Sequence, residues 1–197
     1  MRPSLLAVAA TLALAFGGAA VADPIEDGVD AAISGDYATA LTLLGAGATR
    51  GDARAQFFLG IMYESGRGVT KDTAVAARFY RQSADQGLAT AENNLGSLYA
   101  NGDGVAQSDV EAIRLWMLAA DQGLPVAQAN LASSYATGTY VPKDLVQAYK
   151  WSALAAAQGY RDGADILAVV TMLISPEDKQ SAERLVRAWR PSRTSGA

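Results

Sequence analysis

Hydrophobic residues in the middle of the chain recur at every third or fourth position, which is the period of an amphipathic helix. Ala55, Leu59 and Tyr63 step by four residues and therefore fall on one face of a helix. A glycine-rich loop then interrupts the pattern, a second helical run starts near Asp72, and Gly87 ends it. The pattern predicts a unit of helix, loop and helix.

This unit recurs with a fixed period of 36 residues. The positions that keep the period are Gly51, Gly87, Gly123 and Gly159; Ala55, Ala91 and Ala127; Leu59, Leu95 and Leu131; Tyr63, Tyr99 and Tyr135; and Ala76, Ala112 and Ala148. A fixed period in this range is typical of stacked repeat proteins. Every layer of such a stack must bury the same positions, so we expect the repeated Leu, Tyr and Ala residues in the core and the glycines at helix ends.

Both ends of the chain carry partial copies of the unit. We divide the chain into a signal peptide (1–22), an N-terminal cap (23–50), three complete repeats (51–159), C-terminal capping helices (160–190) and a disordered tail (191–197). The sequence thus predicts an all-α solenoid of about five antiparallel helix pairs.

The first 22 residues have the layout of a secretory signal peptide. Arg2 supplies a positive charge, residues 5–16 are a short hydrophobic run, and residues 20–22 read Ala-Val-Ala, a cleavage motif. The run is shorter than the ~20 residues that a membrane-spanning helix needs, which argues against a retained anchor. We expect cleavage near Ala22, no stable membrane insertion afterwards, and a periplasmic or secreted location.

The chain has no cysteine and no histidine, and its formal net charge is −4. Without cysteine, an exported protein is held together by packing alone. An acidic surface argues against a nucleic acid as the partner. Without histidine, Ser-His-Asp and Cys-His catalysis are excluded, and the common zinc sites lose their usual ligands.

No phosphate-binding glycine loop and no Ser-x-x-Lys motif occurs in the sequence. Catalysis by carboxylates alone stays open, although no acidic pair stands apart from the helix surfaces. The segment from Asn101 to Asp109 is superficially similar to a calcium loop, but its oxygens do not follow the EF-hand spacing, so we favour an ordinary turn. We therefore expect no enzyme activity, no cofactor and no metal.

Three stretches of the chain resemble the first half of the Sel-one-like repeat, a relative of the tetratricopeptide repeat: AQFFLGIMYESGRGVTKD, AENNLGSLYANGDGVAQSD and AQANLASSYATGTYVPKD. The segments AARFYRQSADQG, AIRLWMLAADQG and AYKWSALAAAQG resemble its second half. The resemblance implies a right-handed α-solenoid whose first helices line a concave face that binds proteins or peptides. It also implies a role as an exported adaptor, regulator or host-interaction factor, as is common for bacterial members.

The third unit departs from the family pattern at two positions. Ala132 stands where the family favours glycine, and Tyr140 stands where the other units have Gly68 and Gly104. We expect the helix spacing and the loop shape to differ there.

The face of each first helix opposite the repeated core residues varies from unit to unit. It carries Arg54, Phe57, Ile61 and Glu64, then Thr90, Asn93, Ser97 and Ala100, then Val126, Ala129, Ser133 and Ala136. A surface that binds a non-repeating ligand is free to vary in this way, and neutral drift on a solvated face is the alternative. Phe57 and Ile61 favour a binding strip, because they would otherwise be exposed hydrophobic groups. The candidate partner-binding residues are Arg54, Phe57, Ile61, Glu64, Asn93, Asn94, Ser97, Asn130 and Ser133.

Arginines step by three along the last predicted helix, at Arg184, Arg187, Arg190 and Arg193. One interpretation is a contact with an acidic partner or an anionic membrane surface. Basic residues are also common at the C-terminus of a helix, where they interact favourably with its dipole, and we favour that explanation.

The predicted function is that of an exported protein that binds a protein or peptide along the concave face of its first helices, as an envelope adaptor or regulator. A secreted factor that binds a host protein is one alternative. A carboxylate-dependent cell-wall hydrolase is a less favoured one.

Overall fold

The computed structural model describes residues 23–192, which form ten α-helices and no strand. They are α2 (Pro24–Ser34), α3 (Tyr37–Thr49), α4 (Ala53–Ser65), α5 (Thr73–Ala84), α6 (Ala89–Asn101), α7 (Asp109–Asp121), α8 (Pro125–Thr137), α9 (Leu145–Ala157), α10 (Arg161–Leu173) and α11 (Pro176–Ala188). The all-α class predicted from the sequence is confirmed. The predicted signal peptide and residues 193–197 of the predicted tail lie outside the described residues.

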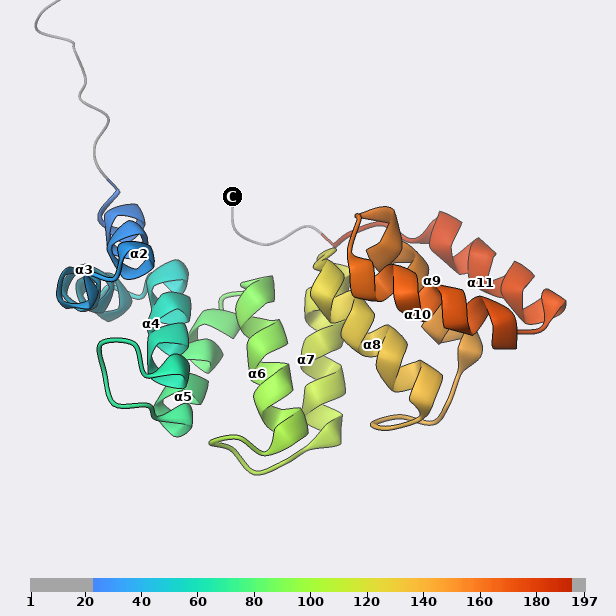
Figure 1. The fold of residues 1–197 in the computed structure, drawn as a ribbon, viewed down its shortest axis with the longest axis horizontal. Coiled ribbons are helices and arrows are strands. Elements are labelled where there is room, and N and C mark those ends of the chain that lie inside the picture. The colour runs from blue at the N-terminus through green and yellow to red at the C-terminus, as the bar shows by residue number, and fades with distance from the viewer. Residues whose placement is uncertain (1–22, 193–197) are drawn as a thin grey trace, which may run out of the picture.

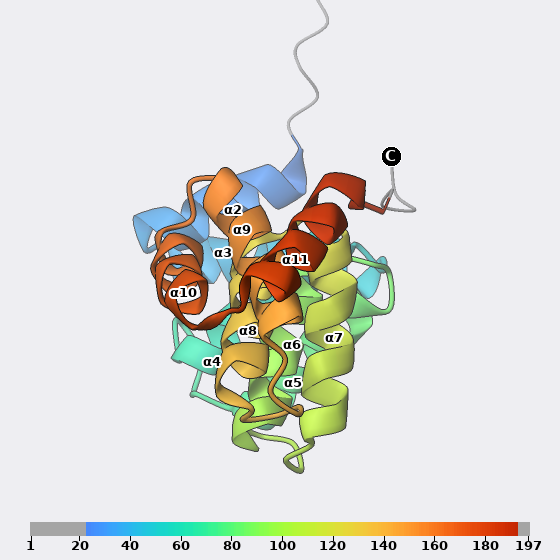
Figure 2. The same ribbon diagram turned by 90° about the vertical axis from the view of Figure 1, so that its right-hand side faces the viewer.

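The helices alternate between two sets, which we call A helices (α2, α4, α6, α8, α10) and B helices (α3, α5, α7, α9). From α4 on, each A helix begins 36 residues after the last, and so does each B helix from α3 on. From α2 to α10 each helix packs on the next along the chain, so that the pairs follow one another along the long axis of the molecule (Figure 1). Seen along that axis, α8 and α10 lie on one side and α7 on the other (Figure 2).

The predicted N-caps and loop glycines explain where the helices begin and end. The B helices follow Asp36, Asp72, Ser108 and Asp144, whose side chains accept hydrogen bonds from backbone N–H groups of the first turn. Each loop between α4 and α9 that joins an A helix to its B helix is closed by one backbone hydrogen bond, as from Asp72 N–H to the Tyr63 carbonyl at 2.9 Å. The loop that was weighed as a calcium site is closed in the same way, by Ser108 N–H on the Tyr99 carbonyl.

Helix spacing within each pair depends on a small residue that faces a side chain of matched size. Gly60 lies against the ring of Tyr80, and Gly96 lies against Trp116; a methyl group at either glycine would come within 2.9 Å of the ring. In the third pair Ala132 takes the glycine position, and the equivalent of the aromatic residue is Ser152, which is fully buried. Ala132 therefore does not disturb the spacing, because the partner residue is smaller.

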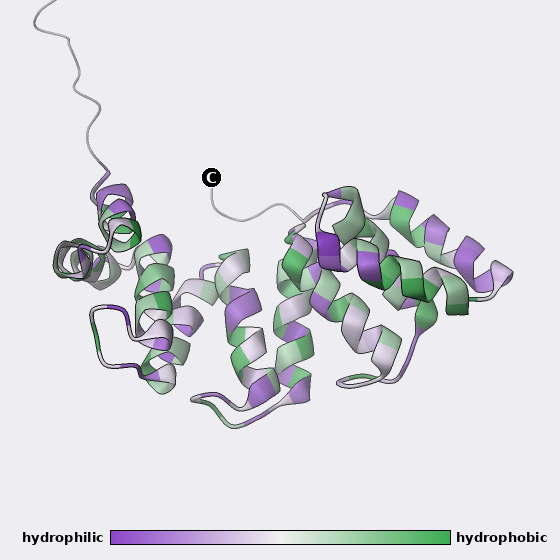
Figure 3. Cartoon of the chain, viewed as in Figure 1, coloured by the Kyte–Doolittle hydropathy of each residue, from purple (hydrophilic) through white to green (hydrophobic). Residues whose placement is uncertain are grey.

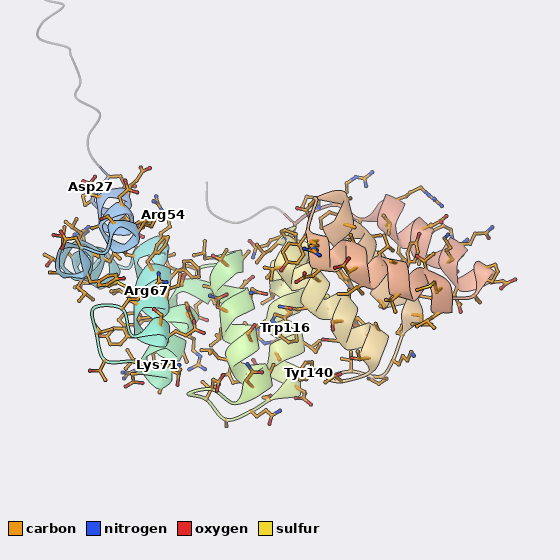
Figure 4. The ribbon with its side chains drawn as sticks, viewed as in Figure 1. Asp27, Arg54, Arg67, Lys71, Trp116 and Tyr140 are labelled. Atoms are coloured by element: carbon orange, nitrogen blue, oxygen red, sulfur yellow. The ribbon has the colours of Figure 1, made fainter. Side chains whose placement is uncertain are left out.

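Tyr140 does change its loop, as expected. The equivalent Gly104 has a φ of +70° and lies so close to the backbone at Thr73 that a side chain would not fit. Tyr140 has no positive φ, and its ring packs edge-on against Trp116 with the ring centres 5.5 Å apart (Figure 4). The third loop thus adds an aromatic contact to the core instead of a close backbone approach.

The C-terminal end differs from the expected fifth helix pair. Both α10 and α11 pack on α9, one on each side of it (Figure 2). The earlier A helices end on a left-handed glycine such as Gly66, whereas α10 ends on Ile174 in an extended conformation, followed by Ser175 and Pro176. This extended exit carries α11 to the B-helix side, where Trp189 packs against the core of the third repeat.

Substitution of glycine by alanine at positions 96 and 45 is expected to have opposite effects. Gly96→Ala should lower the free energy of unfolding by about 1–3 kcal/mol, because its methyl group would press on Trp116. Gly45→Ala should raise it by about 0.5–1 kcal/mol, because Gly45 lies within α3 and a methyl group there meets nothing within 4 Å. Urea denaturation of both variants measures this difference, and a loss of stability of equal size in both would contradict the packing argument.

Candidate partner-binding surface

The structure places the predicted strip on the A helices but buries more of it than expected. Phe57 is half-buried, with its ring 5.8 Å from that of Tyr80 and 5.4 Å from that of Phe58. Ile61 is also half-buried. The expectation that these two side chains stand exposed was wrong, because Phe57 packs against the neighbouring B helix.

Ile61 instead lines a hydrophobic groove between the first two A helices. The groove has a volume of about 190 Å³, and its walls include Val29, Ala32 and Ile33 of α2 and Phe58, Ile61 and Met62 of α4. Ile33 is 77% exposed at its edge. We call this the N-terminal groove.

An equivalent groove lies between the last two A helices. It has a volume of about 290 Å³ and is lined by Ser133, Ala136 and Thr137 of α8 and by Ile166, Val169 and Val170 of α10, together with Asp165. Its α10 wall uses the same three repeat positions as the α4 wall of the N-terminal groove. We call it the C-terminal groove, and it contains Ser133 of the predicted strip.

Hydrophobic side chains of α10 extend the C-terminal groove onto the molecular surface. Val169 is 51% exposed and Met172 is 77% exposed, and Leu173 beside them is exposed as well. The hydrophobic residues of α10 gather toward its C-terminal end (Figure 3). Val169 and Met172 follow Ser133 and Ala136 by 36 residues, so the predicted strip continues onto α10.

Between the two grooves the strip is polar and internally hydrogen-bonded. The Asn130 amide donates to the Asn93 side-chain oxygen at 3.0 Å, and Asn93 donates to Asn94 at 3.2 Å. Ser97 and the indole N–H of Trp116 both donate to the Asn93 backbone carbonyl. Asn93 is buried, so of the predicted amides only the half-buried Asn94 and Asn130 reach the surface.

This polar chain continues to α4 through Tyr80. The Tyr80 hydroxyl donates to the Glu64 carboxylate. Burial raises the pKa of Tyr80 above its ordinary value of 10 and the bond to Glu64 raises it further, while the Asn94 side chain acts in the opposite direction. Tyr80 therefore stays protonated and keeps its hydrogen bond to the predicted site residue Glu64.

Arg54 lies apart from the grooves and forms an ion pair with the first residue of the N-terminal cap. Its guanidinium is 3.1 Å from a carboxylate oxygen of Asp23, the residue that caps α2. Both side chains are exposed, so the pair contributes little to stability. Figure 4 shows Arg54 where α4 meets α2.

A second polar pattern, which the sequence analysis missed, repeats inside the stack. Gln86 donates to Gln56, Gln122 to Glu92 and Gln158 to Gln128, over distances of 2.7, 2.8 and 2.9 Å. The acceptors are 36 residues apart and buried. Glu92 thus takes the place of a structural glutamine.

Burial raises the pKa of Glu92 above its ordinary value of 4.5, and the Gln122 hydrogen bond and the charge of Arg114 offset part of the rise. Glu92 is the one buried acidic residue among residues 23–192.

Among the described residues, no group of three or more His, Cys, Asp or Glu could hold a metal ion. None of the helices in that part of the chain is long and apolar enough to span a membrane.

The arginines at the end of α11 include Arg190, which donates to the backbone carbonyls of Arg187 and Trp189. These hydrogen bonds agree with the helix-terminus explanation. Arg193 lies outside the described residues.

A repeated core with a varied face along one set of helices defines an α-solenoid of the kind that serves as a protein-interaction scaffold. A family model described as the Sel1 repeat matches residues 53–88, 89–124 and 125–160, which is more than half of the chain. The chain belongs to the Sel1 repeat family. Sel1 repeats generally mediate protein–protein interactions, and their fold is typically a non-enzymatic scaffold.

Two solved structures are similar to this one. The crystal structure of a Sel1 repeat protein from Oxalobacter formigenes has a TM-score of 0.68 and 32% sequence identity, over 74% of this chain and 58% of that chain. A protective antigen of uropathogenic Escherichia coli strains with an SLR fold has a TM-score of 0.52 and 24% identity, over 84% of this chain and 44% of that chain, and supports the fold alone. This chain spans about half the length of these proteins. No curated protein matches the sequence.

The sequence analysis missed the α10 and α2 walls of the grooves. Val169 and Met172 were open to prediction, because adding 36 residues to Ser133 and Ala136 reaches them. Ile33 was not, because α2 lies outside the regular period and ends next to α4 only in the folded chain.

The stability of the protein should depend on the protonation of Glu92. Because folding raises its pKa, the folded protein binds more protons than the unfolded chain, and stability falls as the pH rises from the ordinary pKa through the folded one. Glu92→Gln should therefore raise the free energy of unfolding at pH 7 by about 1 kcal/mol. The gain should shrink as the pH falls and vanish below about pH 4, as urea denaturation across pH will measure.

The matched control is Gln128→Glu, which places a carboxyl group at the equivalent, fully buried position. It should destabilise the protein at pH 7 and recover toward low pH. A gain for Glu92→Gln that does not change with pH would show that the charge of Glu92 is not responsible.

Proposed function

We propose that this protein binds an extended segment of a partner protein along its A helices, as an exported adaptor or regulator of the cell envelope. The observation that carries the proposal is the pair of equivalent hydrophobic grooves at the two ends of the A-helix row. Membership of a family of interaction scaffolds supports the binding role.

The spacing of the grooves suggests what the bound segment looks like. The α4 and α10 walls are three repeats apart, and neighbouring helices pack at about 10 Å, so the grooves lie about 30 Å apart. An extended chain covers about 3.3 Å per residue, which places roughly nine residues between the two anchors. The partner segment should carry a hydrophobic residue at each end of that span.

The polar middle of the strip suits the backbone of such a segment. The side chains of Asn94 and Asn130 are half-buried, so they are held in place by their neighbours yet reach the surface. The Asn94 oxygen and one Asn130 N–H are already bonded to Asn93, and the Asn94 N–H groups and the Asn130 oxygen remain to pair with a peptide group. Because peptide backbone is the same in every sequence, this region sets the path of the segment while the grooves select its side chains.

Val169→Asp should weaken binding of a groove ligand about tenfold or more, because it places a charge in the C-terminal groove. The ligand is a peptide selected for binding to this protein from a displayed library of random peptides of about twelve residues. We expect the selected peptides to share two hydrophobic residues about nine positions apart. Calorimetry on the purified variants measures the Kd. Ile33→Asp should have a similar effect at the other groove.

The matched control is Val110→Asp. Val110 is 77% exposed near the start of α7, a B helix away from both grooves. The affinity of the Val110→Asp variant for the selected peptide should stay within about twofold of that of the unchanged protein. If Val169→Asp and Val110→Asp bind equally well, the A-helix site is wrong.

Export is tested separately from binding. The proposal rests on the signal-like residues 1–22, so the mature protein should begin near Asp23 and be released with the periplasmic fraction. N-terminal sequencing of the fractionated protein measures both points. Recovery in the culture medium would favour the secreted alternative, and recovery of the uncleaved chain in the cytoplasm would contradict export.

A further inference from the structure

A third groove lies on the other side of the molecule, between the B helices α3 and α5. It has a volume of about 390 Å³. Tyr63 of α4 lies at its base and stacks on Phe79 of α5, with the ring centres 5.7 Å apart and the planes 20° from parallel. Gln82 of α5 and Leu59 of α4 also line it, and the α3 wall consists of Leu41, Gly45, Ala48 and Thr49. We call this the Tyr63 groove.

The next repeat shows what occupies the equivalent position there. The residues 36 positions after Gly45 and Tyr63 are Arg81 and Tyr99. The Arg81 guanidinium lies over the Tyr99 ring, 5.8 Å from its centre, and donates a hydrogen bond to the Tyr99 hydroxyl. The groove between α5 and α7 is accordingly smaller, at about 200 Å³.

The Tyr63 groove is open because α3 has no side chain to fill it. Gly45 stands where the next repeat has arginine, and a methyl group built on it would meet nothing within 4 Å. Thr49 stands where the next repeat has Asp85. The whole of α3 is uncharged, and no charged side chain lines this groove, whereas Arg81, Asp85, Glu111 and Arg114 line its counterpart.

We propose that the Tyr63 groove binds an arginine side chain of a partner protein. The guanidinium takes the place at Tyr63 that Arg81 takes at Tyr99, where it lies 5.8 Å from the ring centre and donates to the hydroxyl. Thr49 and Gln82 offer further oxygen acceptors at the wall.

Arginine fits the groove better than lysine or a hydrophobic side chain. A guanidinium is a planar cation with several N–H donors, whereas the lysine ammonium is a point charge without a flat face. A purely hydrophobic side chain would make no hydrogen bond to the Tyr63 hydroxyl or to the oxygens of the wall. The site lies on the B-helix side, so it is separate from the two A-helix grooves and does not depend on the function proposed for them.

A short peptide tests the site directly. The probe is acetyl-Gly-Arg-Gly-amide, followed by the NMR signals of the Tyr63 and Phe79 rings during titration. We expect saturable shifts, and the citrulline peptide, which has the same shape without the charge, should bind about fivefold or more weakly. Equal binding of the citrulline peptide or of acetyl-Gly-Leu-Gly-amide would overturn the choice of arginine.

Two variants locate the binding. Gly45→Arg should fill the groove from within and abolish the shifts, while Gly45→Ala, which adds only a methyl group, should keep them. Tyr63→Leu keeps the groove hydrophobic but removes the ring, and should weaken the probe about fivefold or more. Circular dichroism confirms that each variant is folded. Unchanged affinity in Gly45→Arg or in Tyr63→Leu would place the arginine elsewhere and end the proposal.

Discussion

The close contact between a small residue on each A helix and a matched side chain on its B helix is the constraint on which the rest of the structure depends. Gly60 packs against Tyr80 and Gly96 against Trp116, and in the third repeat the buried Ala132 and Ser152 occupy the equivalent positions. Each holds the two helices close enough for the buried glutamine and glutamate hydrogen bonds to form. Because every layer then has the same geometry, the layers stack with a constant step.

A constant step turns differences between layers into differences in surface shape. The A-helix row is polar where Asn93 and Asn130 bond across the layers, and it opens into hydrophobic grooves at both ends. The B-helix row is filled where Arg81 lies on Tyr99 and open where Gly45 leaves Tyr63 uncovered. The scaffold itself is therefore regular, and single residues decide where its surface is filled and where it is hollow.

The helices and the repeat were predictable because both are properties of local sequence and of its period. Asp72 caps a helix where one was expected to start, and Ala76 and Ala112 are fully buried. The exposure of Phe57 was predicted wrongly, because a helical face says nothing about the size of the neighbour across it, here Tyr80. The prediction that the last two helices form a fifth pair was also wrong. The chain leaves α10 in an extended conformation at Ile174, and α11 packs on α9.

The amino-acid sequence by itself determined the class of the protein, since a 36-residue period admits few ways to bury the same positions in every unit. It also placed the varied strip on the A helices. Only the tertiary structure decided where that strip is hollow, because a groove needs two helices and its depth depends on side chains far apart in the chain. Ile33 meets Ile61, and Ser133 meets Val169, only after the helices have packed. The same holds for Tyr63, whose open ring follows from a glycine on another helix.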